Sequence, residues 1–285
     1  MNEFKKDDVE KILARKEFEE LLSQDLSQLS EKRILITGSE GSIGKKLNQI
    51  LINSEIKVCA TDIVGENKIM DVTSFNEVKT VLNEFNPDII IHLAGAKHAP
   101  IGEHETWETL NINVIGTKNI IDNMSEDCKL ILASTCKSAN PEIVYGASKL
   151  IAERMVLNNR GSVARFFNVI ETQGNVFEIW NSLTDDEEIQ VAESCERHFI
   201  SLDESVGLIL FTMQAAPGRY IVNSGPLVKM GEVAERLYPN RLKKIISPRR
   251  GDRLSEKFLA TSESVESYFL DTKIIKVKNI HDKTF

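Results

Sequence analysis

From Arg33 onward, short apolar runs alternate with amphipathic stretches, and this alternation constrains the fold more than any other feature. The apolar runs lie at residues 33–37, 58–61, 88–93, 130–133 and 163–167, and each has the length of a buried strand. The stretches of helical periodicity between them lie at residues 42–53, 74–85, 106–124 and 145–158. Because parallel strands need long crossover connections, the alternation predicts an α/β fold with a doubly wound parallel sheet.

The pattern divides the chain into three regions. Residues 1–30 carry apolar residues at mostly helical spacing among many charges, which predicts a helical extension packed on its own domain or on a partner subunit. Residues 31–168 carry the strand–helix alternation, and residues 169–285 hold shorter elements separated by Gly and Pro, typical of a small C-terminal lobe. Ligands of open α/β sheets bind at the carboxyl ends of the strands, so we expect the functional residues in those loops.

Composition excludes several classes of protein. The 285 residues include 35 Lys and Arg against 43 Asp and Glu, a net charge of −8, which argues against nucleic acid as a partner. No run approaches the ~18 apolar residues of a membrane span, and the first ten residues have no secretory signal pattern. The four cysteines show neither CxxC nor metal-ligand spacing (Cys59, Cys128, Cys136 and Cys195). We therefore expect a cytoplasmic protein with reduced thiols and no metal site.

A glycine-rich turn joins the first predicted strand to the first predicted helix. The turn runs from Thr37 to Gly44 as TGSEGSIG, and its context makes it a candidate dinucleotide-binding motif of the Rossmann type. Glycines there permit close approach of a pyrophosphate to the helix N-terminus. The second strand ends at Asp62, where a carboxylate suits ribose hydroxyls and repels a 2′-phosphate, so NAD is favoured over NADP. A glycine turn with a capping Asp is the alternative interpretation.

Tyr145 and Lys149 lie four residues apart at the start of a predicted helix, so both project from one face. A tyrosine with an ordinary pKa of about 10 is a poor base at neutral pH, and we expect a neighbouring ammonium to lower that pKa. The pair follows the predicted strand that ends near Ser134 and Thr135. The hydroxyl of Thr135 is then a candidate to share a substrate proton with Tyr145.

With these motifs the chain resembles the extended short-chain dehydrogenase/reductase superfamily. The closer resemblance is to the polysaccharide-biosynthesis (CapD-like) group of UDP-N-acetylglucosamine 4,6-dehydratases. It covers most of the chain, from Lys11 to about Phe258. The segments that carry it are residues 92–100 (HLAGAKHAP), 113–117 (NVIGT), 134–137 (STCK), 140–141 (NP), 165–169 (RFFNV), 197–199 (RHF) and 249–253 (RRGDR).

The resemblance implies a reaction. In such enzymes the tyrosine takes the C4 hydroxyl proton while hydride passes to the nicotinamide, and a lysine matching Lys137 then removes the acidified C5 proton. An aspartate one position earlier protonates the departing C6 hydroxyl, and hydride returns to C6. The product is a 4-keto-6-deoxy sugar.

Cys136 stands where the family has that aspartate. A thiol with a reference pKa of about 8.5 carries a transferable proton at neutral pH, although a charged Lys137 would lower this pKa. Our hypothesis is that Cys136 is the acid; a small neutral filler is the alternative. Three outcomes stay open: dehydration, elimination to a 5,6-ene, and C4/C5 epimerisation without loss of water.

Motifs and resemblance together give three sets of expected site residues. The catalytic set is Thr135, Cys136, Lys137, Tyr145 and Lys149. The NAD-binding set is Gly38, Gly41, Ser42, Ile43, Gly44, Asp62, Asp71, Val72, Ala94, Gly95, Ala96, Tyr145 and Lys149. The set expected to bind the UDP-sugar is Lys97, His98, Asn168, Gly174, Val176, Arg197 and Arg249, and the C-terminal lobe is expected to be mainly substrate-binding. We expect His92 and Trp180 to be core residues.

The sequence is also compatible with other functions. A UDP-sugar epimerase or a 4-keto-sugar reductase would share Thr135, Tyr145 and Lys149. A non-catalytic NAD-binding regulatory protein is a third class, since the acid position is altered. Helices 106–124 and 145–158 are those through which relatives commonly dimerise, so a homodimer or higher homo-oligomer is expected.

Overall fold

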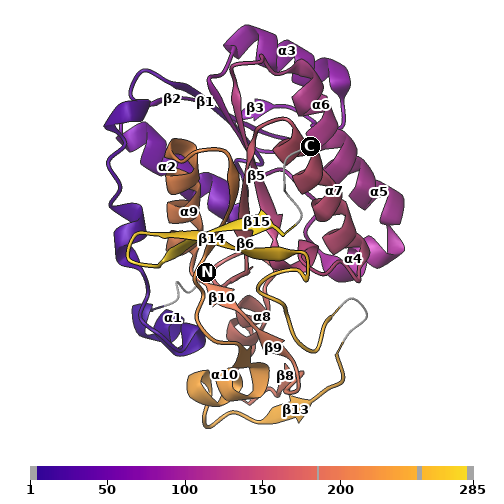
Figure 1. Cartoon of the computed structure of the whole chain (residues 1–285). Helices are drawn as coiled ribbons and strands as arrows, with labels where there is room; N and C mark the ends of the chain where they lie inside the picture. The colour runs from indigo at the N-terminus through magenta and orange to yellow at the C-terminus, as the bar shows by residue number, and fades with distance from the viewer. Residues whose placement is uncertain (1–4, 185, 249–251, 281–285) are drawn as a thin grey trace.

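The computed structural model describes residues 5–184, 186–248 and 252–280. Its centre is a nine-stranded sheet in the order β14-β15-β11-β6-β5-β4-β1-β2-β3 (Figure 1). The strands of this sheet are β1 (Arg33–Thr37), β2 (Lys57–Asp62), β3 (Lys68–Ile69), β4 (Ile89–His92), β5 (Lys129–Thr135), β6 (Ser162–Phe166), β11 (Gly218–Val222), β14 (Glu263–Phe269) and β15 (Ile274–Asn279). From β3 to β11 neighbouring strands are parallel, and β15 and β14 add an antiparallel edge. The expected doubly wound α/β fold is confirmed.

Helices cover both faces of this sheet (Figure 1). One face carries α2 (Ser42–Asn53) and α9 (Leu202–Gln214), which pack on each other, and the other carries α3 (Phe75–Phe85), α6 (Gly116–Asn123) and α7 (Val144–Asn158). Successive residues of a strand point to opposite faces, so Ile34 and Ile36 of β1 join the core under α2 while Leu35 joins the core under α3. Burial on both faces explains the continuous apolar run of β1.

The expected helix over residues 106–124 is present but interrupted. It consists of α5 (Thr106–Leu110), a π-helical turn (Asn111–Ile115) and α6, and the short α4 (Ala99–His104) precedes it. Asn113 lies in the π-turn with its side chain buried, and π-turns of this kind are frequent at functional sites.

A smaller lobe lies beyond the carboxyl ends of the strands (Figure 1). It contains α1 (Lys6–Leu13), α8 (Val176–Ser182), α10 (Met230–Leu237) and three two-stranded sheets formed by β7 (Asn168–Val169) with β10 (Phe199–Ile200), β9 (Glu196–Arg197) with β12 (Val228–Lys229), and β8 (Ile189–Val191) with β13 (Lys243–Ile245). Its apolar core includes Phe177 and Trp180 of α8, so Trp180 is a core residue as expected.

The chain does not stay in this lobe after residue 168, which differs from the expected division. Helix α9 and strands β11, β14 and β15 return to the large sheet, because parallel β11 continues the ladder beside β6 and β15 pairs with β11. Only the segments between these returns build the lobe. The parts of residues 169–285 that the structure describes therefore belong to both units.

The N-terminal extension is helical only at α1 and continues through 3-10 turns at Glu19–Leu22 and Ser27–Leu29. It packs on its own chain: α1 contacts α10 in the lobe, and the first 3-10 turn contacts α9 on the sheet. Arg15 joins it to α9 through a two-pronged ion pair with buried Glu204, at 2.6 and 2.9 Å. Within the described residues, no helix is long and apolar enough to cross a membrane.

Candidate active site

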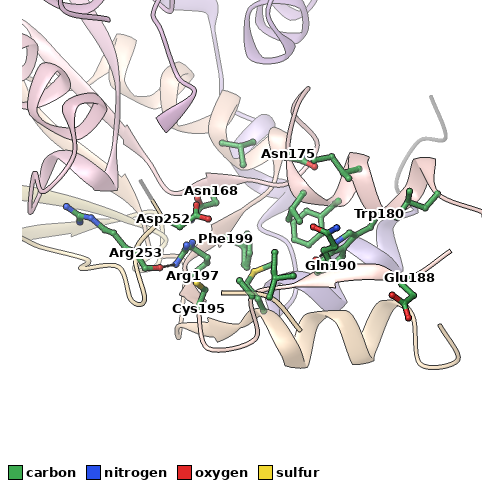
Figure 2. A pocket seen from close by; sticks show the side chains of 18 of the residues that line it. Asn168, Asn175, Trp180, Glu188, Gln190, Cys195, Arg197, Phe199, Asp252 and Arg253 are labelled. Carbon is green, nitrogen blue, oxygen red and sulfur yellow. Dashed lines mark hydrogen bonds between the residues drawn. The ribbon is translucent and has the colours of Figure 1, made fainter. Parts of the chain in front are cut away.

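Two cavities meet at the carboxyl ends of the strands. The first, about 270 Å³, extends from the glycine turn to Tyr145 and Lys149. The second, about 660 Å³, extends into the lobe, with Asn168 and Arg197 toward one end and Trp180 and Glu188 toward the other (Figure 2). Three residues line both cavities: Lys137, Asn168 and Val169. A ligand in one cavity therefore meets a ligand in the other next to the Lys137 amine.

The glycine turn has the shape of a phosphate cradle. Gly38 has φ +72°, and a Cβ on it would lie 2.5 Å from the backbone nitrogen of Ala94; a Cβ on Gly44 would lie 2.4 Å from the Gly38 carbonyl oxygen. Only glycine fits either position. Gly38, Gly41, Ser42, Ile43 and Gly44 all line the smaller cavity, at the N-terminus of α2. This cradle suits a dinucleotide pyrophosphate.

A pair of carboxylates lies beside the cradle at the end of β2. Asp62 accepts hydrogen bonds from the backbone nitrogens of Glu40, at 2.9 Å, and Ile63, at 2.7 Å. The Glu40 carboxylate contacts Lys45, at 3.0 Å, and Asn67. Asp62 therefore lies where the sequence predicted it, and Glu40 adds a second acidic group that the prediction omitted.

The remaining expected NAD-binding residues do not all line the smaller cavity. Asp71 caps the turn after β3, and Val72 is buried in the core. Gly95 lines the smaller cavity, whereas Ala94 and Ala96 are held by their backbone nitrogens, which donate to Thr37 and to Asn113.

His92 helps to hold the loop at Ala94–Ala96 through hydrogen bonds to two threonines. Its Nδ1 lies 2.7 Å from the Thr37 hydroxyl and its Nε2 lies 3.2 Å from Thr117, and complete burial lowers its pKa to about 3. Since Thr37 also accepts from Ala94 and Thr117 donates to the Asn113 carbonyl, the neutral ring links the strand to the π-turn. His92 is a core residue, as expected.

Thr135 and Tyr145 are hydrogen-bonded through their hydroxyls, and Lys149 lies beneath them with its amine 3.1 Å from the Ala133 carbonyl. Burial lowers the pKa of Lys149 to about 8, although Glu153 opposes it. The expected lowering of the Tyr145 pKa is wrong in its net direction: burial raises it, and Lys137 and Thr135 oppose this only in part. The cation that acts on Tyr145 here is therefore Lys137.

Lys137 is held by a buried network. Its amine lies 3.0 Å from Glu256 Oε1 and 3.2 Å from Asn168 Oδ1, and Asn168 Nδ2 donates to Glu256 Oε2 at 2.7 Å. Arg197 Nε lies 3.8 Å from the same carboxylate. Burial alone would lower the pKa of Lys137, but the Glu256 carboxylate outweighs it and raises that pKa. The network leaves Lys137 a cation at neutral pH.

Cys136 lies below the cavities. Its side chain is buried at 1% exposure, packs in the core under the sheet, and is not among the residues that line either cavity. Burial, reinforced by Glu256, raises the pKa of the thiol to about 12, and the thiol hydrogen-bonds Glu256. The thiol is protonated, as the hypothesis requires, and it contacts the Thr135 hydroxyl, at 4.0 Å, and Glu256. Because the thiol itself does not line either cavity, its placement does not favour an acid role.

The structure places three of the seven expected sugar-nucleotide residues at the larger cavity. Asn168, Val176 and Arg197 line it. Lys97 lines the smaller cavity and donates to the Gln173 carbonyl at 2.9 Å, and a Cβ on Gly174 would lie 3.1 Å from the His98 ring, so these two loops meet. Arg249 lies outside the described residues. Arg253 lines the cavity, yet its guanidinium points away from it (Figure 2).

A second buried charge cluster, which we call the scaffold cluster, supports residues 134–138, the candidate catalytic loop. It consists of Glu153, Arg165, Arg219 and Glu263, with four ion pairs of 2.7–2.9 Å and side chains no more than 2% exposed. The Ser134 hydroxyl donates to Glu153 at 2.6 Å, and Ser138 lies at the same distance. Thr135, Cys136 and Lys137 are thus held between two serines anchored to one carboxylate.

Sequence reasoning missed Glu40, Glu153 and Glu256. Glu40 lies inside the glycine motif, where its charge was visible but not weighed. Glu256 lies three residues after the 249–253 motif and pairs with a lysine 119 residues earlier, so no local pattern indicates it.

The fold, the cradle and the Thr135–Tyr145–Lys149 set define an extended short-chain dehydrogenase/reductase of Rossmann type. Within that class, the chain belongs to a family described as polysaccharide biosynthesis proteins, whose model matches residues 57–278.

Individual relatives agree with this family. The chain is 28% identical over 281 residues to a UDP-N-acetylglucosamine 4,6-dehydratase (inverting) of Campylobacter jejuni strain 81-176, covering 86% of this chain and 84% of that protein. It is 26% identical to a UDP-glucose 4-epimerase of Rickettsia rickettsii, covering 83% and 80%. Its fold is similar to that of Pen from Bacillus thuringiensis, with a TM-score of 0.76, 22% identity and 89% of each chain covered.

Proposed function

We propose that the protein is an NAD-dependent nucleotide-sugar 4,6-dehydratase that acts on UDP-N-acetylglucosamine or a related UDP-hexose. The observation that carries the proposal is the meeting of the two cavities at Lys137, beside Tyr145 and Thr135. A dinucleotide in the smaller cavity and a sugar nucleotide in the larger one would meet at these three side chains. The 28% identity to a protein named as such a dehydratase supports the same conclusion.

The residues of the smaller cavity fit a dinucleotide. Side chains longer than glycine would fill the cradle at Gly38 and Gly44, and the exposed N-terminus of α2 suits a pyrophosphate. Two carboxylates, Asp62 and Glu40, disfavour a 2′-phosphate, which supports NAD over NADP. Bound there, NAD would accept hydride from C4 and supply it to C6.

The side chains divide the remaining work. Tyr145 takes the proton of the C4 hydroxyl, with the Thr135 hydroxyl hydrogen-bonded to its oxygen. Lys149 lies next to them and donates a hydrogen bond to the Ala133 carbonyl, which fixes the position of its amine. Lys137, in its neutral form, takes the C5 proton that the C4 ketone acidifies, and Arg197 lies in the larger cavity where a guanidinium suits the pyrophosphate of the substrate.

The proton for the departing C6 hydroxyl comes from Lys137 in this proposal, because Cys136 does not line a cavity. Lys137, protonated by taking the C5 proton, then donates to O6, and water leaves. A solvent proton taken up by Lys137 is then delivered to C5. The Cys136→Ala variant tests this point: the 4-keto-6-deoxy product should form at a rate within about threefold of wild type. A loss of about a hundredfold or more, as expected for removal of a general acid, would restore Cys136 as the donor.

The buried thiol also supports a second candidate, a UDP-sugar epimerase. If Lys137 does not protonate O6 in place of Cys136, oxidation at C4 and exchange at C5 proceed with no loss of water. The 26% identity to a protein named UDP-glucose 4-epimerase agrees with this alternative.

One experiment separates the candidates. The protein with NAD is incubated in deuterated water with UDP-, dTDP-, GDP- and CDP-hexoses, and products are analysed by mass spectrometry, with Tyr145→Phe as the inactive control. A dehydratase yields a UDP-sugar lighter by one water that carries deuterium at C5. Deuterium at C5 without loss of water identifies an epimerase that acts at C5, and an inverted C4 centre without deuterium, seen on chromatographic separation of the isomers, identifies a 4-epimerase. Consumption of added NADH identifies a 4-keto-sugar reductase. NAD binding with no turnover of any sugar identifies a regulatory protein.

We also propose a cytoplasmic homodimer or higher homo-oligomer, with the C-terminal lobe as the part that mainly binds substrate. Exposed apolar side chains on the outer helices, Trp107 of α5 and Ile151 of α7, support an interface there. Light scattering of the purified protein measures its oligomeric state.

A further inference from the structure

Glu256 has no part in the chemistry proposed so far, yet it contacts the side chain on which that chemistry depends. Its carboxylate is 1% exposed and lies 3.0 Å from the Lys137 amine. The other carboxylate oxygen accepts from Asn168 Nδ2 at 2.7 Å and from the His198 backbone nitrogen at 3.4 Å. A fully used, buried carboxylate of this kind keeps its neighbours in one arrangement.

Glu256 would not contact a ligand bound in either cavity. Lys137 and Asn168 line both cavities, whereas Glu256 is not among the residues that line either of them. Asn168 is bound on both sides, since its oxygen accepts from Lys137 and its nitrogen donates to Glu256. Any effect of Glu256 on a substrate is therefore transmitted through Lys137 or Asn168.

We propose that Glu256 is the positioning residue of Lys137: it fixes the amine where the two cavities meet and makes that amine a stronger base toward the C5 proton of the sugar. The proposal rests on the proposed function, because it takes proton removal at C5 as the task of Lys137. In that step the C5–H bond breaks, its electron pair moves into the C4 carbonyl as an enolate, and the proton forms a new N–H bond on Lys137. The resulting ammonium is neutralised by Glu256.

The charges around the amine support this assignment. Glu256 faces it most closely, and Cys136 and Tyr145 also act on it. Arg197 approaches the same Glu256 oxygen as Lys137, at 3.8 Å, and His198 also interacts with the Glu256 charge. Burial favours neutral Glu256, but Lys137 and Arg197 outweigh it and lower the pKa of this carboxyl. Glu256 therefore stays ionised, and its charge raises the pKa of Lys137. A higher pKa leaves less neutral amine at pH 7 but makes that amine more reactive as a base.

Two measurements on Glu256→Gln test the proposal. The first follows C5 deuterium incorporation into the sugar nucleotide against pH. The second is independent of turnover: competitive labelling with acetic anhydride, followed by peptide mass spectrometry, reports the pH at which Lys137 becomes a neutral amine. Both midpoints should move about one to three pH units lower, and the high-pH rate should fall about tenfold. A variant that unfolds returns the Lys137 labelling midpoint to that of an exposed lysine, so the midpoints are compared only between proteins whose circular dichroism spectra match.

Two further variants keep the test decisive. Glu256→Asp retains the charge one methylene further away, so its labelling midpoint should fall between wild type and Glu256→Gln. Glu235→Gln removes the exposed partner of Lys243, at 3.1 Å, and should leave both Lys137 midpoints unchanged. An unchanged labelling midpoint in Glu256→Gln, or in Glu256→Asp if the former does not fold, overturns the proposal.

Failure of the proposed function gives a different result. If wild-type protein incorporates no deuterium at C5 of any sugar nucleotide, the assigned reaction is wrong and the stronger-base role falls with it. The labelling midpoints still decide whether Glu256 controls the Lys137 amine. Deuterium incorporation with coincident midpoints in wild type and Glu256→Gln overturns the role of Glu256 alone.

Discussion

The protein contains two buried charge networks, and they use their cations differently. The scaffold cluster pairs two glutamates with Arg165 and Arg219, and all four side chains are enclosed. The network at the site pairs Glu256 with Lys137 and Arg197, whose side chains are 18% and 13% exposed to the cavities. A guanidinium does not lose its proton in proteins, whereas a lysine amine does. Arginine therefore serves where a charge must stay fixed, and lysine serves where a proton must move.

The largest expected effect comes from opening the scaffold cluster. Glu153→Ala leaves Arg165 and Arg219 without one of their carboxylates and releases Ser134 and Ser138. We expect the free energy of unfolding to fall by about 3–5 kcal/mol, measured by urea denaturation. The control is Glu266→Ala, which removes the exposed partner of Lys276. Equal stability losses in the two variants would contradict the scaffold role.

Exchanging the cation at the site separates charge from proton transfer. Lys137→Arg keeps a cation beside Glu256 but removes the amine that takes up a proton. We expect deuterium incorporation at C5 to fall by about 10²–10⁴, with little change in the denaturation midpoint. Lys243→Arg is the matched control, since Lys243 is also a largely buried lysine paired with a glutamate. Activity retained in Lys137→Arg would mean that the reaction needs the positive charge at this position and does not need proton transfer by the side chain.

Acid should destabilise the protein more through the scaffold cluster than through an equivalent surface pair. Burial favours neutral Glu153, but Arg165 and Arg219 outweigh it and lower its pKa to about 2 in the folded protein. Because this folded pKa lies below the unfolded value of about 4.3, the stabilisation is complete above pH ~4.3 and is lost as pH falls toward 2. Denaturation curves between pH 5 and pH 2 should show a steeper loss in wild type than in Glu153→Gln. Parallel losses would contradict the assignment.

The smallest expected effect lies at the second carboxylate beside the cradle. Glu40→Gln leaves Asp62 in place and removes a charge that is already balanced in part by Lys45. We expect the ratio of the NADP and NAD dissociation constants to fall by roughly fivefold, about 1 kcal/mol, in calorimetric titrations. Glu55→Gln serves as the control, at a position outside the residues that line the smaller cavity. No change in the ratio would leave Asp62 as the sole acidic determinant.

The sequence predicted the sheet well where a local pattern decides it. The expected strand over residues 33–37 and the expected helix over residues 42–53 coincide with β1 and α2, because an apolar run buried on both faces and a glycine turn mark their limits. Strand β14 was missed because its burial alternates irregularly along a sheet edge.

The site was predictable in its motifs and not in its long-range partners. The glycine cradle and the Thr135–Tyr145 contact follow from local spacing. The Lys137–Glu256 and Glu153–Glu263 neighbourhoods join segments brought together only by the complete fold. The direction of the Tyr145 pKa was wrong for a related reason, since burial is a property of the folded chain and spacing does not reveal it.

The scaffold cluster also bears on the order in which the chain is made. Arg165 emerges from the ribosome 98 residues before its partner Glu263, and Arg219 also precedes that carboxylate. A nascent chain that has completed β11 but not β14 therefore carries two arginines of the cluster against one carboxylate, that of Glu153. We expect the catalytic loop to reach its final geometry late in synthesis, when β14 docks, so the Rossmann part does not mature independently of the C-terminal strands.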